Sequence, residues 1–192
     1  MHIIYNHCMF QKIAMIARWR PVHNGHLPVL RALCQRAEQV IIGIGSANRY
    51  NLRNPFTLEE TIDMLQLALE GFDNYTLIPI SDLDDGPRWR EMVKELLGSL
   101  DLFITDNPYV FKLLEEDYQI ERPVTLVPLN ERMPLDGTTV RRAMARGEDW
   151  QSLVPSAVAE YMIAHQLDVR FRREFGLQTL AQAVDSTPHM IS

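Results

Sequence analysis

Two histidines three residues apart, His23 and His26, are the side chains in this sequence best suited to chemistry. They stand in the tetrapeptide His23-Asn24-Gly25-His26 and can point from one side of a helical turn. Imidazole N–H groups donate hydrogen bonds to phosphate oxygens, and they donate more strongly when the ring is protonated. Gly25 allows a ligand to approach the backbone closely. We therefore interpret the tetrapeptide as a phosphate-binding loop rather than a surface turn with two incidental histidines.

The flanking segments predict that this loop joins a strand to a helix. Residues 13–17 form a short apolar run, typical of one buried strand. After the loop, apolar residues recur at intervals of three and four, as they do in an amphipathic helix. They are Leu27, Leu30, Leu33, Cys34 and Ala37. A strand-to-helix junction offers an anion free backbone N–H groups and the positive end of a helix. Arg18 and Arg20 add cationic donors where the strand ends.

Apolar runs that alternate with helical patterns predict a Rossmann-like, doubly wound α/β fold with C-terminal helices. We expect five parallel strands, at residues 13–17, 40–45, 75–80, 102–105 and 124–127. Pro79 indicates that the third of these is an edge strand. We expect helices at about 27–37, 57–71, 90–97 and 109–117, one opening near 138, and a last pair near 155–166 and 171–180. Thr57 and Glu60 form a capping box at the start of the second helix.

Length and composition limit the class of protein. The 192 residues fit a single domain, with residues 1–11 an extra strand or leader and residues 185–192 a disordered tail. A net charge of −6 without a basic block argues against general binding of nucleic acid or anionic membranes. Cys8 and Cys34 form neither a metal pattern nor a disulfide framework, and we expect Cys34 in the core. No apolar run reaches membrane-spanning length, so we expect a cytoplasmic protein.

The polar residues at the predicted strand ends favour phosphoryl or nucleotidyl transfer. Open parallel sheets bind ligands at these ends. Phosphate binders are gathered there: Arg18, His23, His26, Thr138, Arg141 and Arg142. Positioning and charge stabilisation do most of the catalysis in such reactions. The sequence has no Walker loop, Ser/His/Asp order or metal cluster, so the second substrate would attack directly and Mg²⁺ would be carried mainly by the triphosphate.

The histidine motif resembles the His-x-Gly-His signature of the nucleotidyltransferase superfamily. Its wider context is similar to the archaeal-type nicotinamide-mononucleotide adenylyltransferases. Matching segments follow the family's order over about residues 12–165, at 18–26, 42–47, 54–57, 78–82, 89, 107–108 and 137–142. The resemblance implies that the phosphate of nicotinamide mononucleotide (NMN) attacks the α-phosphorus of ATP in line, giving NAD⁺ and pyrophosphate. It also implies Mg²⁺ and a homo-oligomer, often a hexamer.

The resemblance further implies roles for individual residues. Catalytic roles at the ATP phosphates fall to Arg18, His23, His26 and Arg141. Further contacts with ATP fall to Trp19, Gly25, Gly45, Ser46, Thr138 and Arg142. Contacts with the mononucleotide fall to Asp82, Leu83, Trp89 and Asn107, with Trp89 stacking on the nicotinamide. From its residue type alone, Trp89 could equally pack in the core, as we expect for Trp150.

Three positions depart from the family pattern. The first loop, usually Gly-Arg-Phe-Gln-Pro, here reads Ala-Arg-Trp-Arg-Pro and so gains the cation Arg20. Asp136 stands where serine is frequent, and Gly86 lies near the position of a frequent asparagine. The first and third departures bear on the acceptor, because they alter the phosphate pocket's edge and the nicotinamide loop. The second would place a negative charge beside the triphosphate.

Two other functions stay open. The chain could be a nucleotidyltransferase for another acceptor, namely nicotinate mononucleotide, phosphopantetheine or a phosphorylated alcohol with CTP. It could also be a nucleotide-binding sensor or structural subunit without catalysis. Class I aminoacyl-tRNA synthetases share the histidine motif, but this chain is short and acidic and lacks a Lys-Met-Ser-Lys-Ser-like loop.

Overall fold

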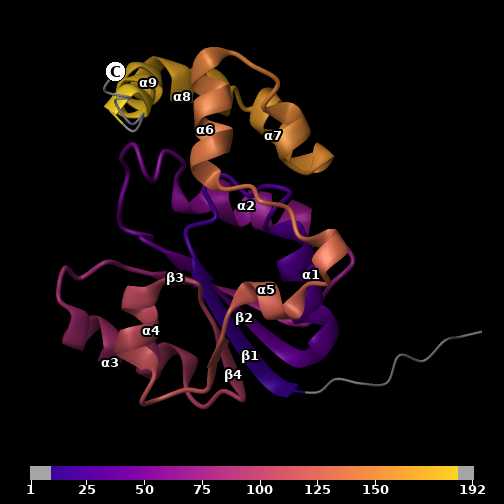
Figure 1. Cartoon of the computed structure of the whole chain (residues 1–192), viewed down its shortest axis with the longest axis vertical. Helices are drawn as coiled ribbons and strands as arrows, with labels where there is room; N and C mark the ends of the chain where they lie inside the picture. Colours follow the sequence, from indigo (N-terminus) through magenta and orange to yellow (C-terminus); the bar gives the residue numbers. More distant parts are fainter. Residues whose placement is uncertain (1–9, 186–192) are drawn as a thin grey trace, which may run out of the picture. The chain divides into compact units, whose positions relative to one another are not determined.

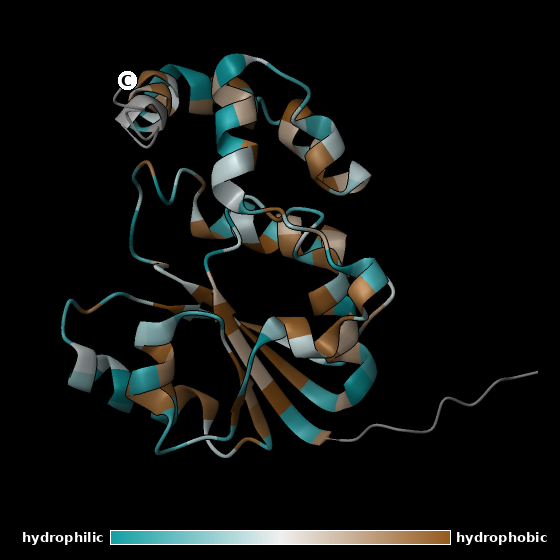
Figure 2. Ribbon diagram, in the orientation of Figure 1, coloured by the Kyte–Doolittle hydropathy of each residue, from teal (hydrophilic) through white to brown (hydrophobic). Residues whose placement is uncertain are grey.

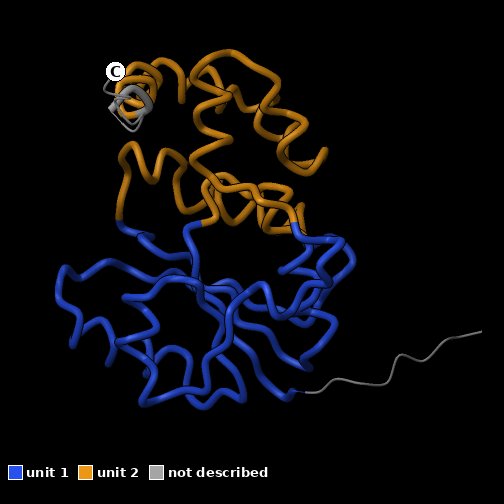
Figure 3. The backbone as a smooth tube through the Cα atoms, viewed as in Figure 1, with its two compact units in different colours: residues 1–18, 28–48, 69–132 blue, residues 19–27, 49–68, 133–192 orange. Residues whose placement is uncertain are grey.

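The chain folds into two compact units. The computed structural model describes residues 10–185. We call residues 10–18, 28–48 and 69–132 the sheet unit, and residues 19–27, 49–68 and 133–185 the helical unit (Figure 3). The expected extra strand or leader lies outside the described residues, except for Phe10 and Gln11, which belong to the first strand. The expected tail lies outside them from residue 186 on.

The sheet unit contains five parallel strands in the order β3-β2-β1-β4-β5 (Figure 1). Their bounds are Phe10–Ala17, Ala37–Gly45, Tyr75–Ile80, Leu102–Ile104 and Ile120–Glu121 for β1 to β5. The predicted α/β fold is thereby confirmed. Pro79 lies in β3, which is an edge strand as predicted. Ala37, predicted to be helical, instead opens β2.

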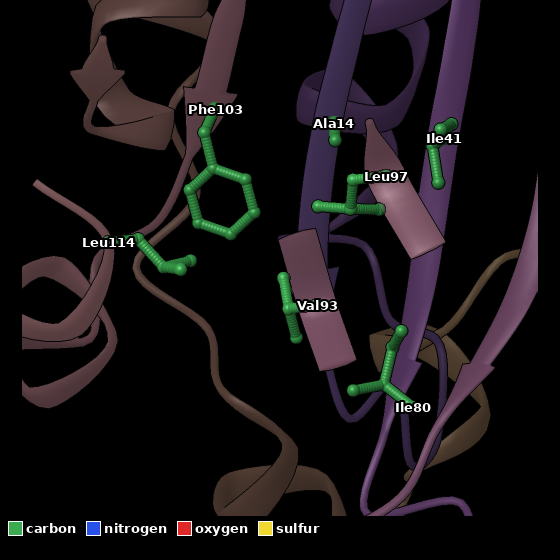
Figure 4. Close-up of a cluster of buried hydrophobic side chains, with 7 residues drawn as sticks. All are labelled: Ala14, Ile41, Ile80, Val93, Leu97, Phe103 and Leu114. Carbon is green, nitrogen blue, oxygen red and sulfur yellow. The ribbon is translucent and has the colours of Figure 1, made fainter. Parts of the chain in front are cut away.

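Helices cover both faces of this sheet. They are α1 (Leu27–Arg36, of which Leu27 belongs to the helical unit), α3 (Gly86–Leu97), α4 (Pro108–Leu114), α5 (Pro123–Leu126) and the 3₁₀ turn η1 (Leu129–Glu131). One face packs against α3 and α4 through a buried cluster of Ala14, Ile41, Ile80, Val93, Leu97, Phe103 and Leu114 (Figure 4). Intervening strand residues such as Ile13 and Ile42 are fully buried too, so the central parts of β1 and β2 are apolar on both faces (Figure 2). Helix α1, with Cys34 buried as predicted, lies on the opposite side of the sheet from α3 and α4 (Figure 1).

Two sequence predictions in this unit are wrong because of prolines and caps. The expected strand at 124–127 is largely the helix α5, since Pro123 at its first turn presets a helical φ. The actual fifth strand, β5, precedes it. Helix α3 begins at Gly86 rather than near Arg90, because Asp85 caps it by accepting a hydrogen bond from the Arg88 N–H at 3.0 Å.

The helical unit is built from residues 19–27, the segment that contains α2, and the chain from residue 133 on. Its elements are α2 (Leu58–Ala68), α6 (Gly137–Arg146), η2 (Gln151–Leu153), α7 (Ser156–Ala164), α8 (Leu167–Phe171), the π-helical η3 (Arg172–Gly176) and α9 (Leu177–Asp185). The capping box is confirmed, because Thr57 N–H donates to Glu60 and Glu60 N–H donates to the Thr57 hydroxyl. Trp150 is buried, as predicted. None of the helices in the described part of the chain has the length and apolarity to cross a bilayer.

Gly43 in β2 provides a test of the sheet packing. A Cβ at this position would lie 2.6 Å from Ile16 Cγ1 and 3.2 Å from Ile80 Cγ1. We expect Gly43→Ala to lower the free energy of unfolding by about 1–3 kcal/mol, the usual cost of overpacking, measured by urea denaturation. Gly45→Ala on the same strand is the matched control, because its Cβ would meet nothing closer than 3.5 Å. Equal losses in the two variants would show that Gly43 is not tightly packed.

Candidate active site

We call residues 19–26 the histidine loop. It lies in the helical unit and begins with a strained residue. Trp19 has φ 56°, in the left-handed region that costs a bulky side chain about 1–3 kcal/mol. Burial of its ring, only 1% exposed, helps to hold this conformation. Asn24 anchors the other end, because its N–H donates to Leu153 O at 2.9 Å and its Nδ2 to Ser152 O at 3.0 Å. The loop is therefore fixed at both ends.

The structure brings the two histidines into direct contact. The rings of His23 and His26 stack with centroids 3.5 Å apart and an interplanar angle of 22°. Trp19 meets His26 edge-on, with centroids 4.8 Å apart. His23 is 2% exposed, whereas His26 is partly buried. The result is a compact aromatic group with two imidazoles at its centre.

Both imidazoles are neutral at pH 7. Burial, helped by the charge of Arg141, lowers the pKa of His23 from 6.5 to about 4, although Asp136 acts in the opposite direction. Burial also lowers the pKa of His26 well below its usual value, and the proximity of His23 lowers it further. His26 Nδ1 accepts a 3.4 Å hydrogen bond from the His23 N–H. Its ring proton is therefore on Nε2, which is left as a donor.

Two glycines permit close packing around this group. A Cβ at Gly25 would lie 2.7 Å from Leu135 O and 3.1 Å from His23 Nδ1. A Cβ at Gly137 would lie 3.0 Å from Arg141 Nη1. Position 25 therefore has no room for a side chain even when no ligand is bound.

Helix α6 begins beside the histidine loop with Asp136 as its cap. Asp136 Oδ1 accepts hydrogen bonds from the Thr139 N–H at 2.7 Å and the Thr139 hydroxyl at 2.9 Å. Burial alone would raise the pKa of Asp136, but these hydrogen bonds, together with His23 and Arg141, lower it overall. An ionised carboxylate at a helix N-terminus stabilises the helix. The sequence interpretation saw only a charge beside the triphosphate, whereas the structure gives that charge a role in the fold.

A hydrogen-bonded chain connects α2 to α6 through Arg20. The Arg20 guanidinium, interpreted from sequence as an added cation at the pocket edge, is buried, and its Nε donates to Thr61 Oγ1 at 3.2 Å. Arg20 O accepts a 2.9 Å hydrogen bond from Arg141 Nη1, while Arg141 Nη2 donates to Thr138 Oγ1 at 3.2 Å. Thr61 is itself held by a 2.7 Å bond to Thr57 O. Sequence reasoning missed Thr61, because no spacing rule connects positions 41 residues apart.

The predicted site residues divide between the two units. The helical unit holds Trp19, His23, Gly25, His26, Thr138, Arg141 and Arg142. The sheet unit holds Arg18, Gly45, Ser46, Asp82, Leu83, Trp89 and Asn107. Each unit therefore gathers one part of the predicted site: the phosphate binders mainly in the helical unit and the mononucleotide binders in the sheet unit.

Within the sheet unit, the predicted residues follow strand ends. Arg18 is exposed directly after β1. Asp82, after β3, is held by Asn48, whose Oδ1 accepts from the Asp82 N–H at 2.8 Å and whose Nδ2 donates to Asp82 O at 2.9 Å. Trp89 lies on the first turn of α3 and packs against the cluster of Figure 4, so its ring does have the packing role considered from sequence. Asn107 caps α4.

The buried His23 makes stability depend on pH. As pH falls below 6.5, the imidazole takes up a proton in the unfolded chain but stays neutral in the folded one down to about pH 4. We expect this difference to lower the free energy of unfolding by about 3 kcal/mol across that range. We expect His23→Asn to flatten this dependence of stability on pH, measured by urea denaturation at several pH values. Parallel profiles for wild type and His23→Asn would contradict the assignment.

Comparison with known proteins identifies the family. The sequence profile of the cytidylyltransferase-like family matches residues 17–152. The nicotinamide-nucleotide adenylyltransferase of Methanococcus vannielii is 35% identical over 152 residues, which cover 78% of this chain and 86% of that protein. The enzyme of the same name from Thermococcus kodakarensis is 36% identical over 160 residues, covering 80% and 83%. That of Picrophilus torridus is 39% identical over 149 residues, covering 76% and 86%.

Solved structures agree at the level of the fold. The bifunctional NMN adenylyltransferase/ADP ribose pyrophosphatase of Francisella tularensis matches with a TM-score of 0.71 at 17% identity, over 96% of this chain and 59% of that one. Its complex with AMP and a manganese ion matches with a TM-score of 0.67 at 19% identity, over 94% and 57%. This chain thus spans less than two thirds of that protein. From its profile match and its archaeal relatives, this chain belongs to the cytidylyltransferase-like nucleotidyltransferases, in the group of the nicotinamide-nucleotide adenylyltransferases.

Proposed function

We propose that this chain joins ATP and NMN to give NAD⁺ and pyrophosphate, with the histidine loop and the start of α6 binding the ATP phosphates. The observation that carries this proposal is the cluster of His23, His26 and Arg141 within the helical unit. Two histidines of one loop and an arginine from a distant part of the chain lie close together there, near the N-terminus of α6. Relatives that carry the name nicotinamide-nucleotide adenylyltransferase support the choice of substrates.

The proposed reaction needs no general base. An anionic oxygen of the NMN phosphate attacks the α-phosphorus and forms the new P–O bond. The bond to the bridging oxygen breaks, and pyrophosphate leaves with the electron pair. Negative charge spreads over the oxygens of the transferring group, where positioned donors stabilise it. His26 Nε2–H and the Arg141 guanidinium are the donors that this chain supplies.

Neutral imidazoles suit an anionic ligand that arrives in a dry site. Before ATP binds, burying two charged rings in contact would be costly, and the lowered pKa values avoid that cost. The negative charge of the triphosphate raises the pKa of any imidazole beside it. ATP binding therefore draws a proton onto the histidine pair, which strengthens its hydrogen bonds to phosphate.

We propose that Mg²⁺ enters with ATP on its phosphates. Within residues 10–185, no three His, Cys, Asp or Glu side chains are grouped so that they could hold a metal ion. Mg²⁺ commonly keeps waters and substrate oxygens as ligands, which fits this residue set. The bound ion would supply charge neutralisation of the triphosphate.

The mononucleotide is proposed to bind through residues of the sheet unit, namely Asp82, Leu83, Trp89 and Asn107, with Arg18, Gly45 and Ser46 serving ATP. Strand ends in open parallel sheets are the usual ligand sites. Trp89 is partly rather than fully buried, which supports contact with a ligand. We further propose that residues 1–192 act as one nucleotidyltransferase domain in a cytoplasmic homo-oligomer.

Formation of NAD⁺ from ATP and NMN with Mg²⁺ tests the proposal. Nicotinate mononucleotide should be run in parallel. We expect turnover with NMN. Turnover with nicotinate mononucleotide but not with NMN would show that nicotinate mononucleotide is the acceptor. ATP binding without turnover of either would favour a nucleotide sensor.

His26→Ala tests the catalytic role of the loop. We expect kcat to fall about 10²- to 10³-fold, the cost of removing a transition-state donor, with the thermal unfolding midpoint little changed. His165→Ala is the matched control, because His165 is exposed after α7. A loss below about tenfold for His26→Ala would mean that this ring does not contact the reacting phosphate.

Thr61→Val tests the connection through Arg20. Valine keeps the shape of threonine but removes the acceptor of Arg20 Nε, so the carbonyl that receives Arg141 loses its support. We expect kcat to fall about tenfold and the free energy of unfolding by about 1–3 kcal/mol, with the KM for NMN unchanged. Thr61→Ser, which restores the hydroxyl, should recover kcat. Equal kcat values for the valine and serine variants would argue against this positioning role.

A further inference from the structure

At Gly86, the space that a Cβ would occupy lies close to a neighbouring hydroxyl. It opens α3, after the acidic connection that follows β3. Its φ lies outside the left-handed region, so its backbone conformation is open to other residues. A Cβ at this position, however, would lie 2.6 Å from the Tyr109 hydroxyl oxygen and 3.3 Å from Leu113 Cδ2. The Tyr109 hydroxyl therefore stands where a side chain at position 86 would begin.

The cap at the start of α4 anchors the backbone of Tyr109. Asn107 Oδ1 accepts hydrogen bonds from the Tyr109 N–H at 2.9 Å and the Val110 N–H at 3.4 Å. The Asn107 N–H in turn donates to Thr105 Oγ1 at 3.1 Å. Tyr109 is 61% exposed, so much of this residue is open to solvent. A large aromatic is thus presented at the surface on a rigid helical turn.

This hydroxyl lies at the ligand-binding edge of the sheet unit. Helices α3 and α4 begin after the carboxyl ends of β3 and β4, where open α/β sheets bind ligands. Trp89 is three residues after Gly86 and therefore lies on the same side of the first turn of α3. Tyr109 accordingly stands next to the turn that carries the proposed stacking residue.

We infer that Tyr109 is a specificity-determining residue for the acceptor, with its hydroxyl hydrogen-bonded to the amide group on the acceptor's pyridine ring. The inference rests on the proposed function, since it needs the acceptor at this edge. A hydroxyl both donates and accepts, which matches the C=O and NH₂ of a carboxamide. The carboxylates of Asp82, Asp84 and Asp85 on the adjacent connection disfavour an acceptor whose ring carries a carboxylate instead.

Tyr109→Phe tests this role, because it keeps the ring and removes only the hydroxyl. We expect the KM for NMN to rise about five- to tenfold, the size of one neutral hydrogen bond, with kcat and the KM for ATP unchanged. Calorimetric binding of NMN should weaken by the same factor. Tyr118→Phe is the matched control: its hydroxyl, which donates to Gly98 O at 3.0 Å, has a structural role, so its loss should leave acceptor binding unchanged.

A second pair of variants tests the shared space. Gly86→Asn alone should weaken NMN binding, because its Cβ displaces the Tyr109 hydroxyl. Gly86→Asn combined with Tyr109→Ala removes that clash and places an amide in the same region, so binding should recover at least in part. An unchanged NMN affinity in Tyr109→Phe would overturn the inference while leaving wild-type turnover intact. A wild-type protein that neither binds nor converts NMN would overturn the proposed function, and this inference with it.

Discussion

The structure of the candidate site depends on the stacking of two buried imidazole rings, those of His23 and His26. Contact at 3.5 Å is tolerable only while both rings are neutral, and burial keeps them so. Trp19 has a strained φ, and in this conformation its ring packs against His26. Gly25 lacks a side chain because Leu135 O occupies that space. Strain, glycine and burial together hold donors in place before any phosphate arrives, which is the condition for electrostatic catalysis.

The elements that local physics decides could be predicted from the sequence. The capping box of Thr57 and Glu60 fixes the start of α2, and short apolar runs marked the first four strands. The prediction was wrong where an apolar run at 124–127 followed Pro123, because proline at the first turn favours a helix over the strand that valines suggest. The alternation of strands and helices predicts a parallel, doubly wound sheet. It does not predict the order of the strands or their register.

The candidate site was predictable in its residue types but not in its connections. The histidine loop and the residues after the strands were found from spacing, and the structure places them in two units, of which only the helical one contains the histidine pair. The burial of Arg20 against Thr61 and the position of the Tyr109 hydroxyl beside Gly86 bring together positions far apart in the chain. Such contacts depend on tertiary packing, for which a single sequence carries no local signal.

The ring ¹⁵N chemical shifts of His23 and His26 at pH 7 test the central claim most directly. In the ligand-free protein, we predict two neutral rings, with the proton of His26 on Nε2. Addition of ATP should move at least one ring toward the protonated form, because phosphate charge offsets the cost of burial. Two charged rings before ATP is added, or neutral rings that do not respond to ATP, would contradict a phosphate site built on a neutral histidine pair.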